Sequence, residues 1–557
     1  MARGESVKRA VYAADFETTT DPNDCRVWGY GIADTNDPEN VTIGDTVDGF
    51  IEAISELRII CYFHNLRFDG HFIIDWLMKN GYEYTDDKVN EDGLFSALIS
   101  DTGKFYSITV AWREGGRTEF RDSLKKLPMS IKRIGEAFGY EEGKGEIDYD
   151  KPRPVGYVMT DEERDYIRID VAILAKAIKQ VHVDNGMTKL TIGSDSLAEY
   201  KRTVAVRFDR TFPPFSHRMD AHIRKAYRGG YTYADPRFKG RKVGSGIVLD
   251  VNSLYPSVMK NRLIPYGEPK IFSEYQEPTK ERPLQIFGVT FTAKLKPGHL
   301  PCIQVKGSSA FVPTEYVREI SEPVSLMVTS TDWELYNDHY DINVIAYEGG
   351  YAFQAATGLF DDYIDKWVRV KEHSEGGIRE IAKLHLNSLY GKLATNPNTT
   401  GKIPYLKDGA VHYRRGPEEV RAPVYTAAGA YITSWGRDLT IRAAQENYET
   451  FAYADTDSLH LLRDDVPTSL ETHRTRMGAW DHEYSFQHAF YIRAKAYLEQ
   501  KHSGEYVNRI AGLPTHISGK LTFDDIRDGL IIDGKLTPKS VPGGVVLVDT
   551  PYELKLD

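Results

Sequence analysis

The spacing of apolar residues in the first third of the chain predicts strands that alternate with helices. Short apolar runs such as "AVYAADFE" (10–17) and "IICYFH" (59–64) are typical of buried strands. The run "DGHFIIDWLMKNG" (69–81) predicts a helix that ends at Gly81. The clearest helix is 160–181, because Thr160 and Glu163 form a capping box and apolar residues recur every three or four positions. We therefore expect one α/β domain here.

The rest of the chain shows a different order of elements. An apolar strand, "SGIVLD" (245–250), precedes a region rich in Pro, Gly and short strand-like pieces without a long helix, about 262–357. Two helical patterns at 360–373 and 378–394 have a short Gly-Gly connection, which predicts an antiparallel helical hairpin. Alternation around Asp408-Gly409 predicts a β-hairpin, and 534–554 predicts a small strand pair. The fold class expected is α/β and α+β, in several domains.

Composition narrows the class of protein. A chain of 557 residues is too long for one core, and 41% hydrophobic with 27% charged residues is ordinary for globular proteins. The three cysteines are far apart, which argues against a disulfide framework and favours a reducing compartment. No apolar run is long enough to span a bilayer, and no secretory signal is evident. We expect a cytoplasmic protein.

The charge is distributed unevenly along the chain. A net charge of −11 argues at first against a polyanionic partner. Residues 224–242, however, carry seven Lys or Arg against one acid, with tyrosines between them, and 123–133 has only basic charges. Basic and aromatic side chains together suit a sugar-phosphate backbone and stacked bases. The alternative is a solvated basic loop.

Acidic residues in the first domain fall on separate elements. Asp15 and Glu17, one residue apart, end the first apolar strand, although such residues are also common in turns. Asp69, in "YFHNLRFDGHF" (62–72), is expected just before a helix. Tyr166 and Asp170 share one face of the capped helix because they are four residues apart. Four such acids are ligands that Mg²⁺ or Mn²⁺ prefers, and a pair of these ions can activate water against a phosphodiester.

A second set of acids lies further along. Asp455 and Asp457, in "FAYADTDSLHLL" (451–462), are one residue apart, so in an extended chain both carboxylates project to one side and repel each other unless a cation lies between them. A calcium loop is a poor match, because its later glycine and glutamate are missing. Asp250 ends another strand, and Pro256 suits the first turn of a helix whose N–H groups can hold phosphate oxygens.

Two further patterns suggest contacts with a nucleotide and a primer. Lys383, Asn387 and Tyr390 form one polar stripe at helical spacing, in which the lysine would meet a triphosphate and the tyrosine would cover the nascent base pair. A solvated helix face explains the lysine and the asparagine equally well. "RAKAYLE" (493–499) places Lys495 and Tyr497 on one strand face, which predicts a clamp on the primer, the alternative being an ordinary edge strand.

These motifs resemble those of a known family. In order and spacing, the first set of acids resembles the D-x-E, N-x-x-x-D and Y-x-x-x-D exonuclease motifs of proofreading DNA polymerases. "DVNSLYPSVM", "KLHLNSLYGK" and "YADTDS" together resemble motifs A, B and C of family B DNA polymerases, and "YRGG" resembles their Y-x-G-G element. Insertions after motifs A and B resemble the two terminal-protein regions of the protein-primed bacteriophage subgroup, the phi-twenty-nine type. The resemblance covers essentially the whole chain.

The resemblance implies an RNase H-like 3′–5′ exonuclease domain joined to a right-hand polymerase. The domains it implies are the exonuclease domain (1–190), the first part of the palm (191–261), terminal protein region 1 (262–357), the fingers (358–395), the terminal protein region 2 hairpin (396–424), the second part of the palm (425–512) and the thumb (513–557).

The resemblance also implies roles for particular residues. Metal ligands and catalytic groups for synthesis would be Asp250, Asp457 and Val251, with Asp455 a less direct ligand; for degradation they would be Asp15, Glu17, Asp69 and Asp170, with Tyr166 orienting the water. Nucleotide contacts would come from Tyr255, which would block a ribose 2′-hydroxyl, and from Leu254, Val251, Lys371, Lys383, Asn387 and Tyr390. DNA contacts would come from Tyr227, Gly229, Gly230, Lys495, Tyr497, Asn65, His64, Phe68, Thr18, Ser123, Leu124 and Lys144. Met129 stands where the family has an aromatic residue.

The implied cofactors are two Mg²⁺ or Mn²⁺ ions in each active site. The implied partners are primer-template and single-stranded DNA, dNTPs and a terminal protein that supplies the priming hydroxyl, in the cytoplasm of an infected bacterium and with the chain as a monomer. The resemblance also implies strand displacement. Three alternatives predict other outcomes: a metal-dependent nuclease without synthesis, a DxD-type nucleotide-sugar transferase, and a non-catalytic DNA-binding protein. Primer extension with dNTPs and Mg²⁺ separates all of them.

Overall fold

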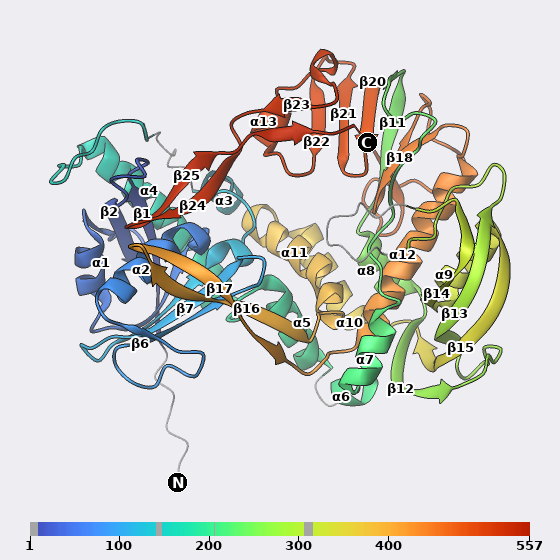
Figure 1. The fold of residues 1–557 in the computed structure, drawn as a ribbon, viewed down its shortest axis with the longest axis horizontal. Coiled ribbons are helices and arrows are strands. Elements are labelled where there is room, and N and C mark those ends of the chain that lie inside the picture. Colours follow the sequence, from blue (N-terminus) through green and yellow to red (C-terminus); the bar gives the residue numbers. More distant parts are fainter. Residues whose placement is uncertain (1–8, 141–146, 205–206, 306–315, 557) are drawn as a thin grey trace, which may run out of the picture.

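The computed structural model describes residues 9–140, 147–204, 207–305 and 316–556. Its N-terminal domain is built on an eight-stranded sheet of order β3-β2-β1-β4-β8-β7-β6-β5, with β1 parallel to β4 and β4 parallel to β8 (Figure 1). The strands are β1 (Ala10–Thr18), β2 (Val27–Asp34), β3 (Thr42–Gly44), β4 (Arg58–Phe63), β5 (Glu83–Tyr84), β6 (Leu94–Ile99), β7 (Phe105–Ala111) and β8 (Arg117–Asp122). The helices are α1 (Val47–Ile54), α2 (Leu66–Lys79), α3 (Ile131–Phe138) and α4 (Asp161–Ile178), with short turns η1 (Ser123–Lys125) and η2 (Lys179–Asp184).

Local signals explain the clearest elements of this domain. The Thr160 side chain accepts from the backbone N–H of Glu163, whose carboxylate accepts from the N–H of Thr160, so the predicted capping box starts α4. Helix α2 begins at Leu66, earlier than expected. Asp69 therefore lies inside its first turn and not before it, which corrects the prediction. Asn65, in the left-handed conformation, turns the chain from β4 into α2.

A second, central sheet has the order β22-β21-β20-β11-β19-β18-β9, with β10 also paired to β20. Its strands are β9 (Thr232–Ala234), β10 (Lys242–Val243), β11 (Gly246–Val251), β18 (Phe451–Asp455), β19 (Ser458–Leu461), β20 (Trp480–Arg493), β21 (Ala496–Lys501) and β22 (Tyr506–Ile510). Helices α8 (Leu254–Asn261) and α12 (Thr426–Glu446) pack beside it, and α5 (Ile192–Thr203), α6 (Phe208–Thr211) and α7 (His217–Arg224) lead to it from the N-terminal domain. Helix α12 is buried on almost every side, so it carries no amphipathic signal, and the apolar pattern did not predict it.

Between α8 and β18 the chain forms three separate units. A four-stranded sheet of order β12-β15-β13-β14 contains β12 (Ile264–Phe272), β13 (Leu284–Leu295), β14 (Glu319–Thr329) and β15 (Tyr340–Ala356), with α9 (Ser330–His339) against it. Helices α10 (Asp361–His373) and α11 (Gly376–Leu393) form the predicted helical hairpin. Strands β16 (Asn398–Lys407) and β17 (Ala410–Val420) form the predicted β-hairpin, in which Asp408 and Gly409 both have positive φ angles, 50° and 76°.

The C-terminal segment returns to the N-terminal domain. It contains α13 (Thr515–Ser518), η3 (Phe523–Asp525), β23 (Leu530–Ile532), β24 (Leu536–Val541), β25 (Gly544–Asp549) and β26 (Tyr552–Leu554). Strands β24 and β25, which we call the C-terminal hairpin, reach across the molecule so that their tip meets α2 (Figure 1). A Cβ on Gly543 would lie 2.1 Å from the carbonyl oxygen of Cys25, and one on Gly544 would lie 2.4 Å from the Phe72 ring. The tip is thus inserted where only glycine fits.

Both hairpins complete the core of the N-terminal domain. Val411 of β17 and Val541, Val545 and Val546 of the C-terminal hairpin belong to the apolar cluster that fills this domain. The hairpins also meet each other through a bridge between Ala410 and Pro542. Segments distant in sequence therefore share one core.

Candidate active sites

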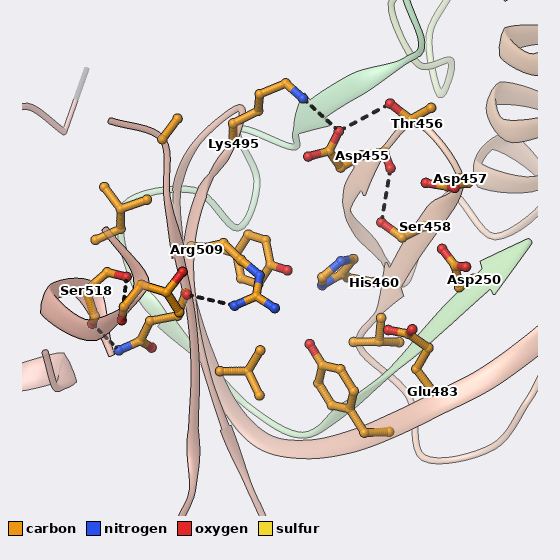
Figure 2. Close-up of a pocket in the computed structure, with 18 of the residues that line it drawn as sticks. Asp250, Asp455, Thr456, Asp457, Ser458, His460, Glu483, Lys495, Arg509 and Ser518 are labelled. Carbon is orange, nitrogen blue, oxygen red and sulfur yellow. Dashed lines mark hydrogen bonds and ion pairs between the residues drawn. The ribbon is translucent and has the colours of Figure 1, made fainter. Parts of the chain in front are cut away.

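An open pocket of about 530 Å³ lies between strands of the central sheet and α13 (Figure 2). Acidic, basic and other polar side chains from β11, the β18–β19 turn, β20, β21 and β22 line it. They include Asp250, Asp455, Thr456, Asp457, Ser458, His460, Glu483, Tyr484, Lys495, Tyr497 and Arg509.

Asp250 and Asp457 lie together at one side of this pocket (Figure 2). Asp250 pairs with Ser458 across β11 and β19, and the N–H of Val251 donates to the Asp457 carbonyl at 2.8 Å, so backbone pairing places the two side chains together. Burial, and then the negative charges of Asp457 and Glu483, raise the pKa of Asp250 to about 8. Burial also raises the pKa of Asp457. The pocket therefore holds close acids whose repulsion a cation would relieve.

The prediction that the carboxylates of Asp455 and Asp457 project to one side is wrong. Strand β18 ends at Asp455, and the chain turns back at Thr456, whose φ is 63°. Asp455 Oδ1 instead accepts from the Thr232 hydroxyl at 3.0 Å and from Lys495 Nζ at 3.2 Å. A two-residue turn separates side chains that an extended strand would align. Asp455 thus faces the basic side of the pocket, away from Asp250 (Figure 2).

Glu483 is an acid of this pocket that the motifs did not indicate. It lies on β20 at a register shift between its pairings with β11, and its charge contributes to raising the pKa of both Asp250 and Asp457. In the sequence it is one of several polar residues in a strand, with no spacing that links it to the other acids. Only the pairing of β20 with β11 brings it there.

Lys495 and Tyr497 line the pocket, but not from one strand face as predicted. Lys495 lies in the turn between β20 and β21 with a φ of 60°, and its N–H donates to the Tyr453 hydroxyl at 2.9 Å. The prediction failed because a strand pattern does not reveal a tight turn with positive φ at lysine. Tyr497 stands on β21, and its ring lies 5.0 Å from that of His460.

A buried carboxylate organises the side chains beneath the Lys495 turn. Glu499 is fully buried and lies 2.6 Å from His460 Nδ1, while the hydroxyls of Tyr491 and Tyr484 donate to it at 2.8 and 2.7 Å. A buried carboxylate needs such donors to offset its lost hydration. No motif or spacing predicted this network.

The polar stripe of α11, which is Lys383, Asn387 and Tyr390, lies near two further cations, Lys371 and Arg379. Lys383 Nζ lies 2.8 Å from Glu380, Asn387 is exposed, and Arg379 donates to the Lys371 carbonyl at 3.0 Å. Burial, and then the charges of Arg379 and Lys383, lower the pKa of Lys371. Three cations close enough to perturb one another form a site suited to a polyanion. Arg379 was not predicted, because one more basic residue on a helix face carries no specific signal.

Tyr390 and Tyr255 meet at the base of this stripe. Their ring centroids are 4.2 Å apart, which joins α11 to the N-terminal turn of α8. Leu254 and Val251, close to Tyr255 in sequence, are buried, and the left-handed Ser253 sets the direction in which α8 starts. The structure therefore brings these predicted nucleotide contacts together.

The "YRGG" segment is fixed by a buried arginine. Arg437 of α12 donates to the carbonyls of Arg228 and Gly229, both at 2.7 Å, and forms a buried ion pair with Asp332. A Cβ on Gly230 would lie 2.7 Å from Thr456, so this glycine lets the segment pass beside the β18–β19 turn. Tyr227, partly buried, packs against the neighbouring apolar core. The segment therefore reaches the first pocket.

The predicted acids of the N-terminal domain also converge. Asp15 and Glu17 on β1 raise the pKa of the buried Asp69 on α2, after the effect of burial itself. Burial, and then Asp170, Glu17 and Asp15, raise the pKa of Tyr166 on α4, although a contact with Tyr149 opposes this. Asp15 and Glu17 therefore lie within electrostatic reach of both Asp69 and Tyr166, and Asp170 lies within reach of Tyr166.

Tyr149 is an addition to this site that the sequence did not predict. Its hydroxyl oxygen lies 3.4 Å from that of Tyr166, and burial, then Glu17, raises its pKa. Its approach depends on how the segment before α4 folds, which the motif spacing does not reveal.

Several predicted strand-binding residues lie at the carboxyl ends of the neighbouring strands β1, β4 and β8. His64 Nδ1 lies 2.9 Å from Ser123 Oγ, and its Nε2 lies 2.8 Å from the Met129 carbonyl. Ser123 is fully buried and donates to the Phe63 carbonyl, so its side chain supports His64. The N–H groups of Asn65 and Leu124 donate to Asp122, Phe68 is partly buried on α2, and Thr18 is buried at the end of β1. Lys144 lies outside the described residues.

Both acidic clusters suit Mg²⁺ or Mn²⁺. In each, carboxylates raise the pKa of a neighbouring group, so a divalent cation would remove an existing repulsion. Within the described ranges, no three His, Cys, Asp or Glu side chains form a ready-made metal cage. Mg²⁺ fits such an open arrangement, because it keeps several waters and takes one or two carboxylates together with substrate phosphates.

Comparison with known proteins decides the family. The sequence profile described as DNA polymerase type B, organellar and viral, matches residues 53–153 and 145–475. The chain is 40% identical over 573 residues to the DNA polymerase of Bacillus phage phi29, which covers 98% of this chain and 99% of the relative. This chain belongs to the organellar and viral type B DNA polymerases. It is also 32% identical over 578 residues to the DNA polymerase of Streptococcus phage Cp-1, with 98% of each chain covered.

Solved structures extend this result to the fold of the type B DNA polymerase. Phi29 DNA polymerase complexed with primer-template DNA and incoming nucleotide has a TM-score of 0.93 at 40% identity, covering 98% of this chain and 100% of that one. Phi29 DNA polymerase complexed with single-stranded DNA has a TM-score of 0.91. The predicted family, mixed α/β multidomain fold and DNA polymerase activity are confirmed. No helix in the described residues is both long and apolar enough to cross a bilayer.

Proposed function

We propose that this type B DNA polymerase builds DNA at the pocket of Asp250 and trims it at the acids of the N-terminal domain. For synthesis, Asp250 and Asp457, with the carbonyl of Val251, would hold two Mg²⁺ ions. When bound, the ions neutralise charge on the α-phosphate and on the leaving pyrophosphate. Glu483 contributes negative charge to the same site. Asp455 orients Lys495 through the ion pair between them.

The chain's own side chains position the reactants. Lys371, Lys383 and Arg379 bind the triphosphate. Because these cations repel one another, they favour a ligand with several negative charges. Tyr390 and Tyr255, in contact, cover the nascent base pair, and Tyr255 blocks a ribose 2′-hydroxyl. Lys495 and Tyr497 hold the primer so that its 3′-hydroxyl attacks the α-phosphorus in line. Positioning and charge stabilisation supply most of the rate.

For trimming, the acids of β1, α2 and α4 would hold a second pair of divalent ions. Tyr166, held near Tyr149, orients the attacking water. His64, Asn65, Phe68, Thr18 and Leu124 hold the frayed 3′ end, with Ser123 supporting His64. We assign Lys144 to this site from the sequence alone.

The convergence of Asp250 and Asp457, from strands distant in sequence, is the observation that carries the proposal. A primer-extension assay with dNTPs and Mg²⁺ tests it: the wild type lengthens the primer and Asp457→Asn does not. Synthesis by Asp457→Asn at the wild-type rate contradicts the assignment. A nuclease without synthesis only shortens the primer, and a nucleotide-sugar transferase leaves it unchanged.

We further propose protein priming and strand displacement, with the domain boundaries given by the sequence resemblance. The relatives from phages phi29 and Cp-1 cover nearly this whole chain, insertions included, which supports the assignment. The β16–β17 hairpin and the C-terminal hairpin, joined at Ala410 and Pro542, would enclose the duplex. Incubating the polymerase with its terminal protein and labelled dAMP should label that protein covalently. Labelling of an oligonucleotide primer only would exclude protein priming.

A further inference from the structure

One histidine of α11 lies on the face away from the nucleotide-binding stripe. His385 is two residues from Lys383 and two from Asn387, which places it on nearly the opposite side of the helix. It is buried, with 1% of its surface exposed, between α11, α10 and α5. The face that binds the triphosphate and the face that carries His385 therefore belong to one rigid element.

His385 contacts both neighbouring helices. Its Nδ1 lies 3.1 Å from the Tyr363 hydroxyl of α10 and 3.2 Å from Ser196 Oγ of α5. Its ring stacks on Trp367 of α10, with centroids 3.9 Å apart and an angle of 13° between the planes. A buried ring held by two hydrogen-bonding groups and one stacked ring allows little rotation of α11 about its axis.

The other hydrogen bonds of these hydroxyls determine the proton position on His385. The Ser196 hydroxyl donates to the Ile192 carbonyl at 2.9 Å, and the Tyr363 hydroxyl donates to the carbonyl of His385 itself at 3.0 Å. Both hydroxyl protons are therefore in use, so Nδ1 must carry the proton and donate. Glu199 Oε2 of α5 lies 3.6 Å from Nδ1, but burial, then the charges of Lys366 and Lys126, lowers the pKa of His385 to about 3, so the ring is neutral at working pH.

Nε2 is then an acceptor without a proton. It is buried and has no hydrogen-bond partner in the described part of the chain. His385 lines a cavity of about 120 Å³, which has room for a water that could donate to it. A bare acceptor costs less to bury than a bare N–H, which favours the same tautomer.

The helix that receives the hydrogen bond is itself anchored. Asp195, beside Ser196 on α5, forms a buried ion pair with Lys126 of the N-terminal domain at 2.5 Å, and Lys126 also donates to the Met187 carbonyl. The N–H of Lys189 donates to the same aspartate. Helix α5 is therefore a fixed support against which α11 can be held.

We propose that His385, as its neutral Nδ1–H tautomer, is a positioning residue for nucleotide binding that fixes α11 against α5 and α10 so that Lys383, Asn387 and Tyr390 face the incoming dNTP. This rests on the proposed role of the α11 stripe. It assigns to His385 an effect on dNTP affinity without contact with the nucleotide. It makes no contribution to trimming, whose acids lie on other elements.

Steady-state primer extension with the full chain tests this. His385→Leu keeps an apolar side chain of similar size but removes the donor, and loss of one buried hydrogen bond corresponds to roughly a tenfold change. The KM for dNTP should rise about tenfold, with kcat changed less than threefold and degradation of single-stranded DNA unchanged. His385→Asn, whose amide N–H can replace Nδ1–H, should restore most of the affinity. Ser196→Ala should raise the KM, and the combination with His385→Leu should add little.

Two further measurements keep the outcomes distinct. Lys383→Ala reports on the stripe itself. If the KM for dNTP is unchanged in both Lys383→Ala and His385→Leu, the proposed triphosphate site fails. If the KM rises for Lys383→Ala but is normal for His385→Leu, only the role of His385 is overturned. Should His385→Leu not fold, Ser196→Ala and His385→Asn carry the test. Nitrogen-15 NMR of labelled histidine should show a protonated Nδ1 and a bare Nε2 for His385. The opposite tautomer, or a ring that titrates near pH 6, overturns the assignment.

Discussion

Asp250→Asn should stabilise the metal-free protein while abolishing synthesis. The pKa of Asp250 rises from an ordinary 3.8 to about 8, because the side chain is buried and faces Asp457 and Glu483. In the unfolded chain it ionises near pH 4, but in the folded chain near pH 8. Its ionisation therefore opposes folding increasingly from pH 4 to pH 8, and the effect is constant above that. Asparagine has no such proton equilibrium.

The magnitude follows from the pKa change. At 1.36 kcal/mol for each pKa unit, the full effect is at most about 6 kcal/mol, and the stability gap between Asp250→Asn and wild type should grow by at most about 1.4 kcal/mol per pH unit. Water in the open pocket screens part of the repulsion, so we expect a measured gain of roughly 2–4 kcal/mol at pH 8.5. For domains of this size that is about 5–15 °C in melting temperature.

The assay is thermal unfolding in EDTA at pH 5.5, 7 and 8.5, with Asp464→Asn as a matched control. Asp464 is exposed and close in sequence to the active-site turn, so its substitution should change the melting temperature little at any pH. Mg²⁺ added at pH 8.5 should raise the melting temperature of the wild type more than that of Asp250→Asn. A gap that is absent, or that does not widen with pH, refutes the reasoning.

Three other predictions concern DNA synthesis and trimming. Asp15→Ala with Asp69→Ala should slow degradation of 3′-labelled single-stranded DNA at least about 100-fold and leave extension intact, since a metal site loses its ligands; equal loss of both activities contradicts separate sites. Gly543→Ala should undock the C-terminal hairpin and shorten products on a singly primed template, whereas Gly504→Ala, also at positive φ but with open space around it, should not; equal product lengths for the two variants refute docking as the cause. Tyr255→Val should raise ribonucleotide incorporation at least about tenfold, measured by alkaline cleavage of products; unchanged discrimination excludes a steric role for Tyr255.

Local chemistry made much of the fold predictable. The capping box of Thr160 and Glu163 starts α4, and Asp408-Gly409 closes the β16–β17 hairpin, because each signal acts within a few residues. The acids of both sites could be selected because each lies at or just after the end of an apolar strand, or on a helix. The order of these motifs along the chain was enough to indicate the family.

Contacts between distant segments were not predictable in the same way. Glu483 reaches the first pocket only through strand pairing, and Lys495 lies in a turn that its strand-like neighbours conceal. Helix α12 is buried on almost every side, so it has no clear apolar stripe. His385 reads as a polar residue within a polar motif, and only its burial against Ser196 and Trp367 gives it a distinct position. Periodicity reports which face is covered, but not by which partner.

The insertion of the C-terminal hairpin into the N-terminal domain affects how this chain acquires its structure. Cys25 and Phe72 are made early in translation, yet the valines that cover them come almost five hundred residues later. Until then the nascent first domain exposes an apolar groove. Chaperones can bind this apolar surface during that interval. A fragment that contains only the N-terminal domain should therefore aggregate. Supplying residues 536–549 as a separate peptide would be a direct way to make such a fragment tractable.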